Sequence, residues 1–186
     1  ATRDLLFVGN FGHPPNEDAI RYFHGEIWPL LTRALPGVAV DIIGPSPSPA
    51  LRELQEPRFR FLGHVPDLTP FLRERRVFVA PLRFGSGMKG KIGLALAHGL
   101  PVVTTPVGVE GIPLKHDRDI LIARGPRDFS RAVITLYRDE PRRREMAWQG
   151  YQAFQARFSL SATASRVRRT VAALLSLPIR TQDAHG

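Results

Sequence analysis

The chain has 186 residues, 43% of them hydrophobic, so it is long enough to bury the core of one folded domain. It contains no cysteine, which excludes a disulfide framework, thiolate metal sites and cysteine nucleophiles. The net charge is +9, no apolar run approaches the ~18 residues that cross a bilayer, and no signal-peptide pattern is visible, so we expect a soluble, cytoplasmic protein.

Short apolar runs alternate with amphipathic segments over the first two thirds of the chain. The apolar runs predict six strands, at Leu5–Gly9, Val38–Gly44, Arg58–Leu62, Arg76–Pro81, Pro101–Thr105 and Asp119–Ala123. A helix is predicted from Pro14 to Leu31, and Pro29 should kink or end it because proline removes a backbone hydrogen bond. Further helices are predicted at Ala50–Gln55, from an N-cap at Asp67 to about Arg75, and from a glycine-rich turn to Gly99.

From Pro126 onward the pattern is helical only, and it predicts three C-terminal helices over residues 124–178 that pack beside the strands. Apolar strands that alternate with helices indicate an α/β fold with a parallel sheet covered on both faces. We therefore expect near-complete burial of Leu5–Gly9, Val38–Ile43, Val77–Ala80 and Val102–Thr104. Ligands bind such sheets at the carboxyl ends of the strands, which points to the loops after Gly9, Gly63, Pro81 and Thr105.

The turn Arg83–Lys91 lies between a predicted strand and a predicted helix and contains three glycines and two lysines. Glycines let backbone N–H groups face a ligand, and a helix N-terminus attracts anions, so a phosphate-bearing ligand fits this turn. A tight turn with solvated lysines is the alternative. Gly85–Lys91 also matches the first seven positions of a P-loop, but Ile92 stands where a hydroxyl must bind Mg²⁺, which argues against a P-loop NTPase.

Three further features are less specific signs of a functional site. Asp117-Arg118-Asp119 has the spacing of a metal- and diphosphate-binding motif, although aspartates before a strand more often cap a turn. Glu110 follows the fifth strand and either binds a hydroxylated ligand or caps its turn. No pair of histidines has the spacing of metal ligands, and His64 stands out only by its position after the third strand.

Four stretches, in this order, resemble the C-terminal, donor-nucleotide domain of a GT-B glycosyltransferase of the group 1 (family 4) type. They are Phe7-Val8-Gly9 with Pro15-Asn16-Glu17-Asp18-Ala19, then Phe61–Asp67, then Pro81–Lys91, and finally Ala95–Thr105 with Gly108-Val109-Glu110-Gly111. Together they cover about two thirds of the chain. The resemblance implies a Rossmann-like parallel sheet with helices on both faces, which is one half of a GT-B fold. It also implies that residues 1–186 form a single nucleotide-sugar-binding domain, without the N-terminal acceptor domain.

The resemblance implies transfer of a sugar, of hexosyltransferase type, from a nucleotide-diphosphate sugar to a saccharide or lipid-linked acceptor in polysaccharide biosynthesis. It implies neither a metal nor another cofactor, and it assigns no catalytic residue here. The donor-binding positions that it implies are His64, Val65, Gly85, Ser86, Gly87, Met88, Lys89, Gly90 and Leu94. Among them His64 and Val65 lie near the base, and Lys89 meets the diphosphate.

The chain departs from the family at two places. Ser86 and Leu94 replace two glutamates eight positions apart, the second of which normally binds the donor ribose. Asn10 and Pro15 replace the arginine and lysine that commonly follow the first strand. Because the acceptor and its catalytic partners belong to the N-terminal domain, we expect the isolated chain to transfer no sugar by itself. A non-catalytic relative that acts in assembly or regulation is the alternative.

The resemblance implies two partners, a nucleotide sugar and the missing N-terminal domain. The positive charge of the C-terminal part suggests a further one. From Arg124 to Arg180 there are twelve arginines and four acidic residues. If they share a face, they would hold the protein at the inner face of an anionic membrane, where a lipid-linked acceptor would lie. A solvated helical surface is the alternative. Nucleic acid is not expected, because aromatic residues are not interleaved with the arginines.

Overall fold

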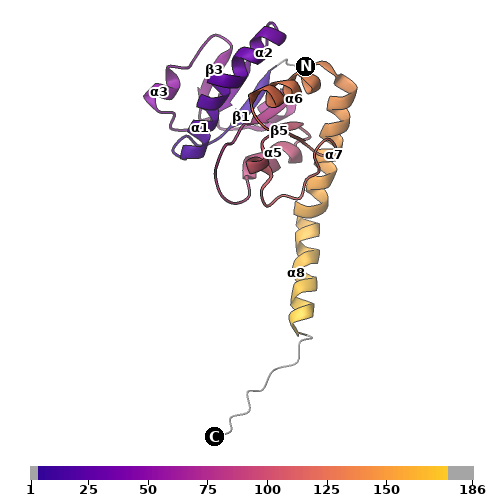
Figure 1. Ribbon diagram of the computed structural model, residues 1–186. Helices are drawn as coiled ribbons and strands as arrows, with labels where there is room; N and C mark the ends of the chain where they lie inside the picture. Colours follow the sequence, from indigo (N-terminus) through magenta and orange to yellow (C-terminus); the bar gives the residue numbers. More distant parts are fainter. Residues whose placement is uncertain (1–3, 176–186) are drawn as a thin grey trace.

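Six parallel strands pair in the order β3-β2-β1-β4-β5-β6 in the computed structural model, which describes residues 4–175 (Figure 1). The strands are β1 Leu5–Val8, β2 Val40–Ile43, β3 Phe59–Gly63, β4 Val77–Ala80, β5 Val102–Thr104 and β6 Leu121–Ile122. The order reverses between β1 and β4, and ligands of such sheets bind at this switch point, at the carboxyl ends of the strands. The predicted parallel α/β sheet is confirmed.

The helices lie on both faces of the sheet (Figure 1). They are α1 Pro14–Tyr22, the π-helical turn η1 Phe23–Ile27, α2 Trp28–Ala34, α3 Pro49–Arg52, α4 Thr69–Glu74, α5 Gly90–Ala97, the 3-10 turn η2 Pro106–Val109, α6 Pro126–Arg138, α7 Glu140–Phe158 and α8 Leu160–Leu175. Short βα loops connect them to the strands, and these loops position the site described below.

Two apolar cores lie on the two faces of the sheet. On β1, Leu5 and Phe7 pack into the core beneath α1, α2 and α6, whereas Leu6 packs into the core beneath α5. The alternation follows from the period of two along a strand. Leu5–Phe7, Val38–Ile43, Val77–Ala80 and Val102–Thr104 are all buried, so the predicted burial is confirmed except at Val8, which is partly exposed.

Proline 29 does not end the first long helix. Instead η1 separates α1 from α2, and the N–H of Trp28 donates to the carbonyl of Phe23, five residues back. Pro29 then occupies the first turn of α2, where its missing N–H is not needed. The predicted interruption is present, but a π-helical turn just before the proline produces it.

Several predicted boundaries move by a few residues, and the physical reason is visible at two of them. The helix after Asp67 begins at Thr69, and the Asp67 carboxylate accepts a 2.8 Å hydrogen bond from the Thr69 N–H without being the N-cap residue. Strand β6 begins at Leu121, because the carboxylate of Asp119 accepts the Lys115 N–H at 2.9 Å and closes a turn there. In both places a local side-chain bond competes with the regular element.

The C-terminal helices do not all pack beside the sheet. Helix α6 packs on η1, α2, β4 and β5, and α7 packs on α5, but α8 has its main contacts with α7 and extends away from the body (Figure 1). Val167 and Val171 on α8 are about half exposed, so this helix buries little against the sheet. The expectation that three helices flank the strands is therefore wrong for α8, and residues 176–178 lie outside the described residues.

Candidate functional site

Three loops meet at the carboxyl ends of β1, β4 and β5. Arg83, after β4, forms a bidentate ion pair with Asp18 of α1 and lies 4.9 Å above the Tyr22 ring, and Asp18 raises the pKa of Arg83 through this bond. Thr105, after β5, donates to the carbonyl of Leu82. These bonds hold the glycine-rich loop Arg83–Lys91 against the loops on either side, so Arg83 has a structural role here.

The backbone of the glycine-rich loop requires glycine at two positions. Gly85 has φ 130° and Gly87 has φ 71°, which residues with a Cβ rarely adopt. No backbone N–H of residues 85–91 donates to a described residue, and α5 begins at Gly90 without a side-chain cap. The loop therefore presents unpaired N–H groups at a helix N-terminus, an arrangement that binds anions.

Lys89 is folded onto this loop. Its ammonium donates to the carbonyl of Gly85 at 3.2 Å and to the carbonyl of Gly87 at 2.6 Å, and it lies 3.9 Å from the Glu110 carboxylate. The side chain is 9% exposed. Lys89 thus braces the loop in this structure, and Glu110, itself mostly exposed, is the acid nearest to it among the described ion pairs.

Lys91 reaches from the first turn of α5 to the end of β1. Its ammonium donates to the amide oxygen of Asn16 and lies 4.5 Å from the centroid of the Phe7 ring. A Cβ on Gly9 would come within 2.9 Å of that ammonium and of the Asn16 side chain, so a larger residue at this position would displace one of them. Burial, and secondarily the charge of Lys89, lowers the pKa of Lys91 from 10.5 to about 7. No described carboxylate forms an ion pair with it.

Asn16 completes this cluster. Its amide N–H donates to the carbonyl of Asn10 at 2.7 Å, which leaves its oxygen to accept from Lys91. The donor-binding positions that the resemblance implies do not include Gly9, Asn16 or Lys91, although Lys91 lies in the turn predicted to take a phosphate-bearing ligand. The sequence signal for Gly9 and Asn16 is a strand that ends in glycine and is followed by a helix with asparagine in its first turn. Lys91 belongs to the same glycine-rich turn as Lys89, but its reach to β1 depends on the fold.

The other predicted donor-binding residues do not gather at one place. Ser86, Met88 and Gly90 are exposed on the glycine-rich loop. His64 lies beside Phe61, Leu62 and Gly63 in a separate hollow of about 500 Å³ at the ends of β2 and β3. Val65 and Leu94 are partly buried and pack against the same apolar core beneath α5. Among the described residues no hydrogen bond or ion pair joins His64 to the glycine-rich loop.

The aspartate motif, His24 and His98 are engaged elsewhere. Asp119 is buried and pairs with Arg118 at 2.8 Å, and Asp117 pairs with Arg142. His24 contacts Glu56 at 3.0 Å, and His98 is bonded to the carbonyl of Leu94 at 2.9 Å. Within residues 4–175 no three His, Asp or Glu side chains are grouped to hold a metal ion.

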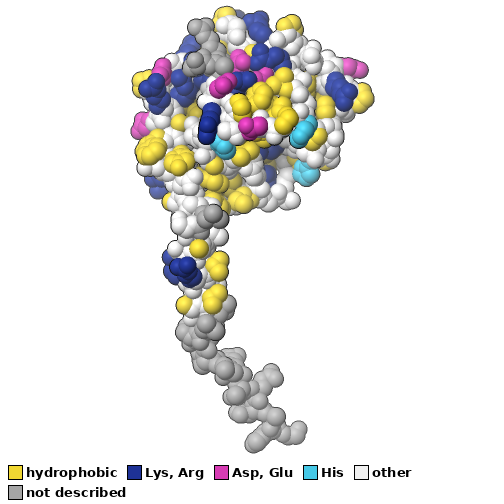
Figure 2. Space-filling view, turned by 180° about the vertical axis from the view of Figure 1, so that it is seen from behind, with side chains coloured by type: hydrophobic (Ala, Val, Ile, Leu, Met, Phe, Trp, Pro, Cys, Tyr) yellow, Lys and Arg dark blue, Asp and Glu magenta, His cyan; other side chains and the backbone are white. Residues whose placement is uncertain are grey.

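The arginines of the C-terminal part are partly paired within their own helices, as Arg131 with Asp128 and Arg144 with Glu140. On the face that Figure 2 shows, Lys and Arg side chains lie among acidic and hydrophobic ones. Of the described helices, none has the length and hydrophobicity of a membrane span. The anionic membrane partner remains a prediction.

The same fold occurs in known glycosyltransferases. The Anabaena protein HepE, solved with UDP and glucose, superposes with a TM-score of 0.72 at 16% identity over 92% of this chain and 48% of HepE. The C-terminal domain of the Francisella tularensis group 1 glycosyl transferase LpcC superposes with a TM-score of 0.67 at 15% identity, over 84% of this chain and 86% of that domain.

Sequence comparison agrees with the fold. An uncharacterized 44.6 kDa protein in the cps region of Klebsiella pneumoniae is 23% identical over 164 residues, which are 83% of this chain and 42% of that protein. The chain thus spans less than half the length of this curated relative. The model of the family "Glycosyl transferases group 1" matches residues 2–139. The chain therefore belongs to the group 1 glycosyl transferases and has the fold of the C-terminal half of a GT-B enzyme.

Proposed function

We propose that this chain binds the diphosphate of a nucleotide sugar between the glycine-rich loop and the end of β1, with Lys91 as the principal cation. The observation that carries the proposal is the Lys91 ammonium, which is buried beside Gly9 and Asn16 without a carboxylate partner. A buried cation without a counter-ion is costly, and an incoming anion would compensate that cost.

The surroundings of Lys91 support a diphosphate as that anion. Lys89 lies close enough for the two ammonium groups to repel each other, and the unpaired N–H groups of residues 85–91 lie on the same loop. Charge-assisted hydrogen bonds from these groups suit phosphate oxygens. Lys91 also supplies a cation at the end of the first strand, where the family commonly has an arginine and a lysine and this chain has Asn10 and Pro15.

The wider activity follows from this binding role. HepE binds UDP, and we propose a uridine nucleotide sugar as donor here, with His64 and Val65 near its base and Ser86, Gly87, Met88 and Gly90 around its phosphates and sugar. We propose transfer of a hexosyl group to a saccharide or lipid-linked acceptor. A second domain must supply the acceptor site and exclude water, so the 186 residues alone should transfer no sugar.

Calorimetric titration with UDP, without divalent metal, tests the proposal. The wild type should bind, and Lys91→Met should weaken binding about tenfold or more, because a charged hydrogen bond contributes roughly 1.5–3 kcal/mol. Lys89→Ala should weaken it as well. Lys115→Ala is the matched control, since it removes the third lysine of the chain from an exposed position. Equal affinity of Lys91→Met and wild type would refute the role of Lys91.

A non-catalytic relative is the second candidate function, and Leu94 favours it. This side chain packs on the core beneath α5, and it stands where the family has its ribose-binding glutamate. Leu94→Glu separates the two candidates. Tenfold or greater tightening of UDP binding would show a donor site that lacks only its ribose acceptor, because a carboxylate can accept from both ribose hydroxyls. A lower melting temperature with no gain in affinity would favour the non-catalytic relative.

A further inference from the structure

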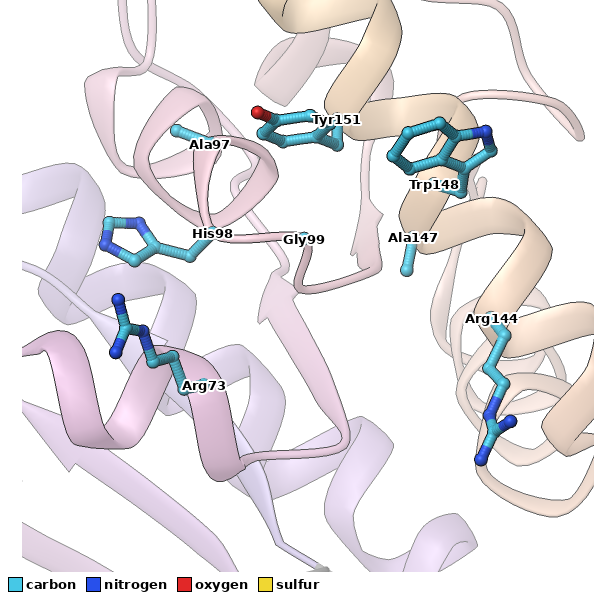
Figure 3. A pocket seen from close by; sticks show the side chains of 8 residues that line it. All are labelled: Arg73, Ala97, His98, Gly99, Arg144, Ala147, Trp148 and Tyr151. Carbon is cyan, nitrogen blue, oxygen red and sulfur yellow. The ribbon is translucent and has the colours of Figure 1, made fainter.

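A hollow of about 510 Å³ lies on the surface between the end of α4, the turn that ends α5 and one face of α7. Its lining consists of Arg73, Ala97, His98, Gly99, Arg144, Ala147, Trp148 and Tyr151 (Figure 3). This volume is in the range of small-molecule sites. The glycine-rich loop adjoins the opposite end of α5, about 12 Å away at 1.5 Å per residue of helix, so the hollow is separate from the donor site.

One wall of the hollow is aromatic. Trp148 and Tyr151 project from successive turns of α7, and their rings stack with centroids 5.9 Å apart and planes at 21° (Figure 3). Trp148 is 56% exposed, which is unusual for so large an apolar side chain. Ala97, Gly99 and Ala147 have small side chains or none, so they leave space beside the rings. A ring-shaped ligand can therefore lie flat against this wall.

The opposite wall carries positive charge. Arg73 and His98 lie together on one side of the hollow, whereas the Arg144 guanidinium points away and is paired with Glu140 (Figure 3). Arg73 forms no ion pair or hydrogen bond with any described residue. No acidic or amide side chain lines the hollow, although outside it the hydrogen bonds from Thr69 and, to a lesser extent, the nearby charge of Arg73 lower the pKa of the exposed Asp67 carboxylate. Its charge thus suits an anionic group placed within reach of Arg73.

The polar groups of the lining are mainly donors. They are the Arg73 guanidinium, the ring N–H of Trp148, the hydroxyl of Tyr151 and the imidazole of His98, and the first three donate to no described residue. A nucleobase needs acceptors for its amino groups, and the lining side chains offer only the Tyr151 hydroxyl and an imidazole nitrogen. The hydroxyl and carboxylate oxygens of a sugar acid accept from the Arg73 guanidinium, the Trp148 ring N–H and the Tyr151 hydroxyl. The apolar face of a pyranose ring, in turn, suits the aromatic wall.

We propose that this hollow is a second binding site, for a saccharide unit that bears a carboxylate. The ring of the saccharide stacks on Trp148 and its carboxylate pairs with Arg73. A concave site of this volume takes a discrete ring, whereas residues that enter a membrane surface protrude from it. The site stands independently of the donor site, and neither proposal requires the other.

Titration with a hyaluronan tetrasaccharide, which alternates glucuronic acid and N-acetylglucosamine, tests the site through the fluorescence of Trp148. Trp28 is buried, so Trp148 dominates any change on ligand binding. Trp148→Ala and Arg73→Gln should each weaken binding at least tenfold in calorimetry, and Trp148→Phe, which keeps a ring, should bind within about threefold of the wild type. Arg131→Gln, an exposed substitution on α6, is the control.

Three outcomes would overturn the proposal. Binding of neutral chitotetraose with equal affinity would remove the role of Arg73 and of the carboxylate. If the tetrasaccharide does not bind, sedimentation with phosphatidylglycerol vesicles that Trp148→Ala abolishes would assign the surface to a membrane. Self-association that Trp148→Ala abolishes would instead assign it to a second copy of the chain. Unchanged affinity in Trp148→Ala and Arg73→Gln, both with wild-type melting temperatures, would place the saccharide elsewhere.

Discussion

The ammonium of Lys91 lies 4.5 Å from the centroid of the Phe7 ring, across the switch point of the sheet. The contact joins the first turn of α5 to β1, and it places a positive charge on the negative face of an aromatic ring. Burial, together with the charge of Lys89, lowers the pKa of Lys91 to about 7, so this ammonium can exchange its proton near neutral pH.

The affinity for UDP should fall as the pH rises above 7. The pKa of Lys91 is about 7, so at pH 8 about nine tenths of the ammonium groups are neutral in the unliganded protein. Binding must then restore the proton, and calorimetry at pH 8 in two buffers of different ionisation enthalpy should show uptake of about one proton per UDP. Lys91→Met should show neither this uptake nor the loss of affinity between pH 7 and 8.

The stability of the wild type relative to Lys91→Met should increase with pH. Because folding lowers the pKa of Lys91 from 10.5 to about 7, the unfolded chain binds more protons between these values. The difference in free energy of unfolding should therefore shift toward the wild type by up to about 1.4 kcal/mol per pH unit in this window. Urea unfolding of both proteins from pH 6 to 9 measures it. A constant difference would mean that Lys91 is not desolvated in the folded state.

Asp41→Ala should destabilise the fold by about 3–5 kcal/mol. The Asp41 carboxylate on β2 is 1% exposed and accepts from Arg60 and Arg75, each at 2.7 Å. Without it, two guanidinium groups lose a buried partner, although Arg60 keeps Asp4. Denaturant unfolding measures the loss, with Asp128→Ala as the control. Asp128 belongs to an exposed pair, so that change should cost about 1 kcal/mol or less.

Gly150→Ala should destabilise the protein by about 1–3 kcal/mol, although alanine is the better helix former. A Cβ on Gly150 of α7 would lie 2.6 Å from the carbonyl oxygen of Asp119, which is backbone and cannot move aside easily. Gly25→Ala is the comparison, because a Cβ there meets nothing within 4 Å. Melting temperatures should fall for Gly150→Ala and hold or rise slightly for Gly25→Ala. A similar response of both variants would contradict the close approach of α7.

Much of the sheet could be predicted because its strands are continuous apolar runs, such as Val77–Ala80, that the structure buries on both faces. The start of β6 was not predictable to the residue, since it depends on the turn that Asp119 closes. The glycine-rich loop could be recognised from its composition. The contact between Lys91 and Asn16 could not be predicted, because these residues are 75 positions apart and only the sheet order brings them together.

The π-helical turn Phe23–Ile27 accommodates one more residue than an α-helical turn would between α1 and α2. Deleting one of its residues should therefore restore ordinary α-helical hydrogen bonding and leave the helix that follows in nearly the same orientation. Trp28 and Leu31, both buried on α2, would then stay in the core. A deletion within α1 would instead rotate the residues before it and after it relative to each other by about 100°. Natural changes in the length of this helix should therefore be confined to the turn Phe23–Ile27.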